Sequence, residues 1–562
     1  MSSDNTAYLV ISSVIAVSLC HYSNALLMRR YIDKFEEQNK LQHFLLPRSM
    51  THIVIMMGLM LAEVSVLLIP LDVANRSSSI YGNIGCSSWN TACGGIDVAT
   101  LWQVVFITIA IFIVFVVPLA IFFYENYDYD AMKDTNGSCC KQFRNALCFQ
   151  MTATIIVGIV LGVTYANPST NNVALPITSI VADVDAAKYT NYEAVTAKSL
   201  AVTTTNEMEV FARGYPVEKT VLNFKVTFPI YLIALMSFLG WFFFVIFAGV
   251  GLVSVPSSLI NAYIETPKEQ MDPSKLNKKK RALVARAKEL EESGNLLKKQ
   301  YRRNGKVVDK KMFNRYKKAV YDLEKDSDEM DSIDEMFSNA DASAFTALMA
   351  FVYLILGGFS IILSFFWILH ICLYILPVSI AAWEGNSNGQ PISLFLNAYF
   401  AAYDGSVPLF GALSVMIFTF YLMICVISGN LKVGTRIFIV QIHPMRIGRT
   451  LPNSILVNVS LILMTSPAIT QFSTQAFADY VRMTDADNMF GAQIKYITFL
   501  KPFFDHGIMT FVFLGFSILA LVYYLTCGRK VEGVDEKKML KMLKGIADTN
   551  DEKKKKKWYQ WG

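Results

Sequence analysis

The residues that could do chemistry in this chain lie in two settings. One is a basic stretch, QIHPMRIGRTLPNS, which places His443, Arg446 and Arg449 between two apolar runs. The other is a set of polar side chains inside apolar runs, of which Glu63 in MLAEVSVLLIP is the most strongly polar. The basic stretch could be a catalytic loop, a phosphate site or a turn on a membrane surface, and Glu63 could belong to a ligand or ion site.

The common signatures of enzymes are absent from the sequence. It has no His-Glu-x-x-His, Cys-x-x-Cys, Gly-x-Ser-x-Gly or Walker sequence, and its six histidines are scattered. Gly249-Val250-Gly251 is a fragment of a phosphate-loop pattern inside an apolar run, and close helix packing before a kink at Pro256 explains it better. We therefore expect no catalytic residue, no metal site, no cofactor and no enzymatic activity.

Composition indicates a membrane protein. Of the 562 residues, 53% are hydrophobic and 17% are charged, whereas about a quarter of an average soluble protein is charged. Apolar segments of about 20 residues cross a bilayer as helices, because the hydrocarbon offers no partner to exposed backbone groups. The fold class is therefore all-α, with nine predicted spans near residues 8–28, 52–72, 101–124, 147–166, 227–252, 345–376, 407–428, 452–475 and 506–527.

The lysines and arginines predict the orientation. If the amino terminus lies outside or in a lumen, 42 of the 51 basic residues fall on the cytoplasmic side, which normally holds the excess. The expected organisation is five spans within 1–264 with external loops 73–100 and 167–226, a cytoplasmic insert at 265–343, four spans within 344–527, and a basic cytoplasmic tail at 528–562. The plasma membrane or an endolysosomal membrane is the expected location.

The insert is predicted to hold two paired helices. Asp272-Pro273 resembles a helix cap followed by proline at the first helical position, and leucines then recur every seven residues from Leu276 to Leu297. Turn residues near Gly305 precede a second apolar pattern that includes Tyr316 and Leu323. A short connection favours an antiparallel, coiled-coil-like hairpin over a dimer seam. We expect protein partners, cytosolic or membrane-bound, to bind this insert.

Surface features follow from the same topology. Cys86 and Cys93 are predicted to form a disulfide in an external loop, worth about 2 to 4 kcal/mol. Arg446 and Arg449 then lie in a cytoplasmic turn at the membrane surface rather than in a catalytic loop. The tail repeats this pattern beside Trp558, so we expect its basic residues to bind membrane lipids and not nucleic acid: Lys553, Lys554, Lys555, Lys556 and Lys557.

Six polar residues inside the predicted spans form the candidate intramembrane site: Glu63, His21, His370, Asn453, Asn458 and Gln471. A charge at the centre of a span costs about 2.5 to 3.5 kcal/mol on insertion scales, so such residues are often retained for function. Two interpretations remain open. The side chains either hydrogen-bond between helices or line a polar cavity for a small solute, ion or lipid.

The order of several motifs resembles the limb-region membrane protein family, which includes the lipocalin-interacting membrane receptors. The matching stretches include LLIPLDVANR, VVPLAIFFYENYDYD, FAGVGLVSVPSSLI, WILHICLYIL, IHPMRIGRTLPNSILVN and QFSTQAFADY, and they span nearly the whole chain. The lipocalin-receptor-like branch is the most similar. The resemblance implies a receptor or a trafficking and transport-accessory protein with an unknown external ligand; a transporter or channel that uses the cavity around Glu63 is the alternative.

The orientation predicts a protease pattern. In sealed vesicles with the cytoplasmic face outward, trypsin should cut between Lys275 and Lys325 and remove the tail, because both segments are expected to face the protease. Peptide mapping by mass spectrometry checks the sites. Protection of the insert together with cleavage in 167–226 would reverse the orientation.

Overall fold

The computed structural model describes most of the helical parts of the chain. It covers residues 3–31, 47–75, 97–125, 138–180, 217–265, 273–304, 316, 319–320, 323, 326–327, 340–384, 390–406, 410–433, 435–437, 440–443, 450–482 and 484–527.

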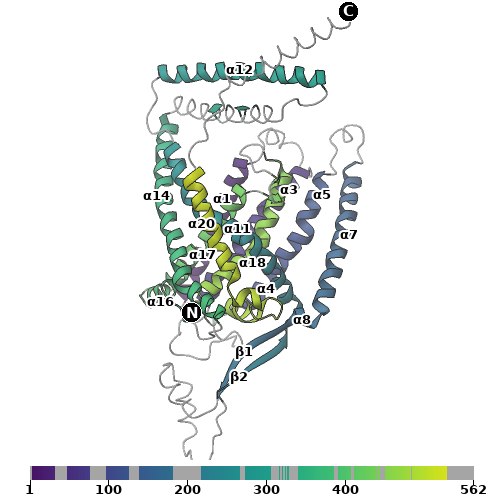
Figure 1. Ribbon diagram of the computed structural model, residues 1–562, viewed down its shortest axis with the longest axis vertical. Helices are drawn as coiled ribbons and strands as arrows, with labels where there is room; N and C mark the ends of the chain where they lie inside the picture. The colour runs from purple at the N-terminus through teal and green to yellow at the C-terminus, as the bar shows by residue number, and fades with distance from the viewer. Residues whose placement is uncertain are drawn as a thin grey trace, which may run out of the picture. The chain divides into compact units, whose positions relative to one another are not determined.

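The described chain is mostly helical, as predicted, with two small antiparallel sheets (Figure 1). The long helices are α1 Ser3–Tyr31, α3 Pro47–Asn75, α4 Val98–Ile111, α7 Ser138–Ala166, α11 Phe228–Glu265, α12 Pro273–Asn304, α14 Ala340–His370, α17 Phe410–Val433, α18 Pro452–Ala476 and α20 Ile508–Cys527. Shorter helices are α5 Val117–Glu125, α8 Pro168–Asn171, α15 Leu376–Trp383, α16 Leu396–Ser406 and α19 Lys501–Asp505, and π-helical turns are η1 Phe112–Val116, η3 Ile371–Ile375 and η4 Asp487–Ile494. The strands are β1 Asn172–Ile180, β2 Val217–Lys225, β3 Thr435–Ile437 and β4 Val440–His443.

The chain divides into two compact units. The first comprises residues 1–255 and 360–521, and the second comprises residues 256–359 and 522–562. Three helices pass from one unit into the other, namely α11, α14 and α20.

Eight of the described helices are long and apolar enough to cross a membrane. They correspond to eight of the nine predicted spans, so the chain is a multi-pass membrane protein. The remaining predicted span, residues 8–28, coincides with α1, which is helical over 29 residues but is not among the eight. The nine-span count therefore stays a prediction.

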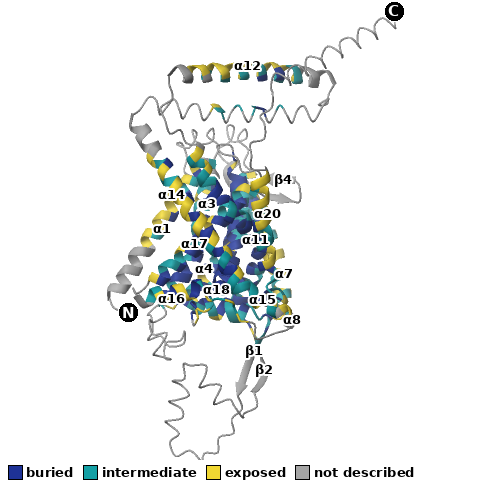
Figure 2. Ribbon diagram, turned by 60° about the vertical axis from the view of Figure 1, so that its left-hand side comes forward, coloured by how far each residue is buried: buried dark blue, intermediate teal, exposed yellow. Residues whose placement is uncertain are grey.

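Helix α18 lies at the centre of the first unit. It contacts α3, α4, α5 and α17, and most of its side chains are buried although many are polar. Figure 2 shows buried residues gathered on the inner helices and exposed residues along α1 and α16. Helix α7 is the most exposed of the eight candidate spans and lies at the edge of the bundle, whereas α18 is the most buried.

Glycines let the inner helices touch backbone to backbone. A β-carbon added to Gly251 would overlap the carbonyl oxygen of Cys425 in α17, and one added to Gly429 would overlap the carbonyl oxygen of Phe247 in α11. Gly240 meets the carbonyl of Met464 in the same way. The structure thus confirms close helix packing at Gly249-Val250-Gly251, where Gly249 lies against α20.

Interruptions of the regular helices expose carbonyl groups that other segments bind. Pro256 has no N–H for the carbonyl of Leu252, four residues earlier, and the Ser364 hydroxyl donates to that oxygen at 2.8 Å. In η1 the Val114 carbonyl accepts the Gln150 amide at 2.6 Å. In η3 the Leu373 carbonyl accepts the backbone N–H of Ile392 at 3.0 Å. In each case a donor from another segment satisfies a backbone carbonyl inside the bundle.

The sheets and several short helices lie between the spans and were not predicted. Strands β1 and β2 form a nine-residue hairpin ladder from Asn172↔Lys225 to Ile180↔Val217, within the loop predicted at 167–226. The first residues of β1 also pair with the stretch after η4, since the N–H of Ala174 donates to the Tyr496 carbonyl at 3.0 Å. Strands β3 and β4 form a second small sheet that ends at His443.

In the second unit, α12 packs against the described residues between 316 and 326. The helix begins at Pro273, as predicted. Leu290 and Ala319 are the buried centre, with Tyr316 and Leu323 packed around them. A β-carbon at Gly294 would meet Tyr316, while Arg286 pairs with Asp326 at 2.6 Å. Since contacts earlier in α12 lead to later residues of the partner segment, the two segments run in opposite directions.

Replacing Gly429 by alanine should destabilise the bundle. The added methyl group would overlap the Phe247 carbonyl, and overpacking of this kind costs about 1 to 3 kcal/mol. Thermal unfolding in detergent measures the effect. Gly158→Ala in α7 is the matched control, because nothing lies within 4 Å of its added carbon; equal melting temperatures for the two variants would contradict the packing.

Candidate functional site

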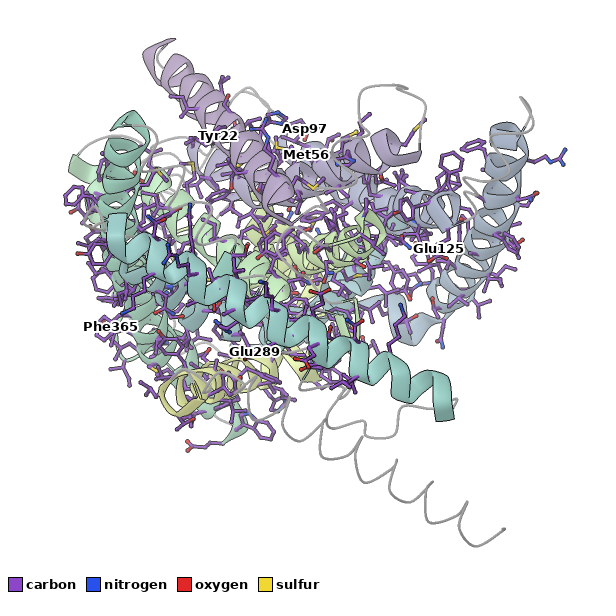
Figure 3. All side chains as sticks on the ribbon, turned by 90° about the horizontal axis from the view of Figure 1, so that it is seen from above. Tyr22, Met56, Asp97, Glu125, Glu289 and Phe365 are labelled. Atoms are coloured by element: carbon purple, nitrogen blue, oxygen red, sulfur yellow. The ribbon has the colours of Figure 1, made fainter. Side chains whose placement is uncertain are left out.

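Glu63 lies in the middle of α3 and is held by α1. Its side chain is 2% exposed, and its Oε2 accepts a hydrogen bond from Asn24 Nδ2 at 2.8 Å. The buried Cys20 thiol lies beside the carboxyl group. Cys20 and Asn24 are four residues apart and so share one face of α1. This arrangement fastens α1 to the middle of α3; Figure 3 shows the two helices from above, where they bear the labelled Tyr22 and Met56.

His21 does not share this contact. It is exposed on α1, although its neighbour Cys20 is buried. Consecutive residues of a helix point about 100° apart, so the rotation that turns Cys20 and Asn24 toward Glu63 turns His21 away. The partner of Glu63 is therefore an asparagine that the sequence analysis did not single out.

Gln471 joins α18 to α11. Its Oε1 accepts hydrogen bonds from the Ser237 hydroxyl at 2.5 Å and from Trp241 Nε1 at 2.9 Å. All three side chains are buried, and Phe472 packs edge-on against the Trp241 ring. Within the described residues, Gln471 Nε2 has no hydrogen-bond partner.

His370 lies where α14 becomes η3. Its Nε2 is 2.8 Å from the carbonyl oxygen of Ala476 at the end of α18, and because a carbonyl only accepts, Nε2 is the protonated nitrogen. The ring stacks between those of Tyr374 and Phe477. Asn397 of α16 also donates to the Ala476 carbonyl, at 3.3 Å. The carbonyl that α18 leaves open at its end thus joins three helices.

Asn453 and Asn458 lie toward the other end of α18. Asn453 Nδ2 donates to Glu125 Oε1 at 2.8 Å, which links α18 to α5 (Glu125 is labelled in Figure 3). Asn458 Nδ2 donates to the Ser454 carbonyl at 2.7 Å, within its own helix. Residues 453 and 476 are about 35 Å apart along a helix that rises 1.5 Å per residue. The structure therefore spreads the six predicted residues over separate contacts.

A further polar centre, which the sequence analysis missed, is Asp72 near the end of α3. Its Oδ2 accepts the Trp102 Nε1–H at 2.9 Å and the Ala486 N–H at 2.7 Å, and its Oδ1 accepts the Asp485 N–H at 3.3 Å. Asp72 is 3% exposed. It caps the helical stretch that opens η4 and binds it to α3 and α4. The sequence feature that could have indicated this centre is a carboxylate directly after the apolar run LLIPL.

The stretch that Asp72 caps also supports the β1–β2 hairpin. After η4, Ile497 bridges Val173, and the Thr498 N–H donates to the Asn172 carbonyl at 2.9 Å. One buried carboxylate therefore connects two spans, η4 and the base of the hairpin.

Several predicted residues lie outside the described part of the chain, namely Cys86, Cys93, Arg446, Arg449, Lys553, Lys554, Lys555, Lys556 and Lys557. The disulfide and the basic membrane-surface residues thus stay predictions. Among the described residues, Cys20, Cys148, Cys372 and Cys425 are free thiols, and no three potential metal ligands come together.

Comparison with known proteins gives one family across nearly the whole chain. The profile described as LMBR1-like membrane protein matches residues 7–525. A LIMR family protein of Oryza sativa subsp. japonica is 29% identical over 94% of this chain and 97% of its own length. One from Arabidopsis thaliana is 30% identical over 84% of this chain and 89% of its own length, and one from Dictyostelium discoideum is 27% identical. No solved structure matches.

Replacing Asp72 by asparagine should loosen the segment that begins at residue 485. Asparagine has a single acceptor oxygen and turns an NH2 group toward N–H donors, and a buried donor left unsatisfied costs about 1 to 3 kcal/mol. We expect a lower melting temperature and faster tryptic cleavage at Lys495.

Asp97→Asn is the control for this change. Asp97 is an exposed N-cap of α4, and hydrogen bonds from Thr100 lower its pKa. Asparagine caps helices about as well as aspartate, so this variant should behave like the wild type. Equal sensitivity of both variants would show that loss of negative charge, not loss of the Asp72 contacts, is responsible.

Proposed function

Because the chain belongs to the LMBR1-like membrane protein family, we propose that it is a multi-pass membrane receptor or a trafficking and transport-accessory protein. It acts by binding and not by catalysis. The amino terminus lies outside or in a lumen, and the carboxyl terminus lies in the cytoplasm of a cell whose plasma membrane or endolysosomal membrane holds the protein.

The observation that favours binding over transport is that the polar groups of the spans are hydrogen-bonded to other segments of the bundle. Glu63 is engaged by α1, Gln471 by α11, His370 by the end of α18 and Asn453 by Glu125. Each group therefore ties one pair of segments. Between these positions, glycines bring α11 into backbone contact with α17 and α18. A path for a solute would instead need a continuous row of polar groups across the bundle that are not engaged in contacts between helices.

The two proposed binding surfaces lie on opposite sides of the membrane. An external ligand would meet the segment 484–500 and the β1–β2 hairpin, which is tied to it through Val173. Cytosolic or membrane protein partners would bind the cytoplasmic hairpin at 265–343, supported by the opposed contacts of Arg286 with Asp326 and of Gly294 with Tyr316.

A transporter or channel for a small solute or lipid is the second candidate. The observation that favours it is a buried carboxyl group in mid-span at Glu63, together with the unpartnered Nε2 of Gln471 and Nδ1 of His370 within the described residues. These atoms could bind water or a ligand if the helices separated.

Glu63→Gln distinguishes the two candidates. Glutamine keeps an oxygen that can accept from Asn24, so the α1–α3 contact and the melting temperature should be preserved, while the titratable charge is lost. The assay is flux in proteoliposomes, with pyranine for protons, a potassium dye for cations and a fluorescent phosphatidylcholine for lipid movement. We expect the wild type and Glu63→Gln to match protein-free vesicles.

Glu63→Leu serves as the structural control. It leaves Asn24 without its acceptor, so a loss of about 0.5 to 2 kcal/mol of stability is expected in this variant and not in Glu63→Gln. Wild-type flux of any probe that Glu63→Gln abolishes would retire the receptor proposal in favour of transport.

A further inference from the structure

The first half of α12 is strongly basic. Residues 278–288, KKKRALVARAK, contain six lysines and arginines and no acidic residue. The first turn of the helix also contains no acidic residue. Like charges three or four residues apart on a helix, such as Lys278 and Arg281, repel one another, so this cluster is unfavourable for an isolated helix. Their position is explained better by a negatively charged partner than by the stability of α12.

The basic side chains lie on the face that packing leaves open. Leu290 is buried against Ala319, and with 100° per residue Lys278, Arg281 and Lys288 lie about 120 to 180° away from it around the axis. All three are exposed, and none of them forms an ion pair with another residue in the part of the chain that the structure describes. Arg286, which points elsewhere, is already paired with Asp326.

Apolar side chains accompany the charges. Val284 is 57% exposed and lies about 120° from Leu290, on the same open face, with the exposed Ala285 beside it. Helices that rest on a bilayer combine lysine and arginine with apolar side chains in this way, because the apolar groups enter the headgroup region while the charges meet lipid phosphates.

The chain keeps the start of α12 within reach of a bilayer. Helix α11 is a candidate span that stays apolar up to Ile264. Seven residues, 266–272, separate its last residue, Glu265, from Pro273. An extended segment of this length reaches at most about 28 Å. A tether of this length gives α12 a high effective concentration at a membrane surface, which neither a soluble acidic protein nor a nucleic acid would share.

We propose that Lys278, Arg281, Lys288 and Val284 form a surface of α12 that binds the anionic phospholipid headgroups of a bilayer. This inference rests on the proposed cytoplasmic position of residues 265–343, since the cytoplasmic leaflet contains the anionic lipids. The protease experiment tests that position, whereas the vesicle measurement below does not depend on it. The two can therefore fail separately.

The test uses the full-length chain in neutral phosphatidylcholine nanodiscs, with Lys553–Lys557 replaced by glutamine in every sample so that the tail contributes equally. Binding to vesicles of phosphatidylcholine, with and without phosphatidylserine, is measured by co-flotation at low and high salt. Lys278→Gln/Arg281→Gln/Lys288→Gln is compared with Lys298→Gln/Lys299→Gln/Arg302→Gln, which removes the same charge from the other end of α12.

We expect binding only to phosphatidylserine vesicles, weakened by salt. The first triple variant should bind on the order of a hundredfold more weakly, at about fivefold per basic residue, and the second at most a few fold more weakly. Equal loss in both variants, or equal binding to neutral vesicles, would overturn the proposal. Tighter binding of soluble polyglutamate or RNA than of phosphatidylserine vesicles would overturn it too, and would identify an acidic protein or a nucleic acid as the partner.

Discussion

A polar backbone group inside a bilayer has no water to bind, and this constraint governs how the helices of the first unit fit together. At three interruptions of the helices, a neighbouring segment provides a donor. Ser364 donates to the carbonyl that Pro256 leaves open, Gln150 to η1 and the amide of Ile392 to η3. These interruptions therefore favour particular neighbours for the helices in which they occur.

Polar side chains and glycines have complementary roles around α18. Lipid is as apolar as leucine, so burial of apolar surface gives little preference for one helix neighbour over another. Glycines such as Gly429 allow close approach, and single polar contacts such as Gln471 with Trp241 select the register. Near the end of α3, Asp72 extends this selection to a segment far away in sequence, at a separation of 414 residues for Ala486. The polar residues described here therefore serve to select which helices pack together and in which register.

The sequence predicted the helices better than their contacts. Bilayer thickness requires long apolar runs, so eight spans were located and α12 was found to start at Pro273. The continuation of α14 through η3 and α15 to Trp383, the helix α16 and the hairpin of β1 and β2 were missed, because short interfacial elements have no such length requirement. Glu63 was identified but its partner Asn24 was not, since the rotation of α1 about its axis depends on tertiary packing. Asp72 was overlooked because a carboxylate at the end of a span resembles an ordinary surface charge.

Proline at position 176 affects how β1 can associate with other chains. Asn172 and Ala174 direct their backbone groups away from β2, toward Thr498 and Tyr496, and alternation along the strand places residue 176 next in that outward series. A proline there removes no hydrogen bond from the ladder with β2, yet it removes the donor that an added strand would need. Next to its contact with residues 496–498, this edge of β1 is therefore a poor template for a further strand. Such an edge resists sheet extension between newly made copies, which protects the hairpin from aggregation while the protein is being assembled in its membrane.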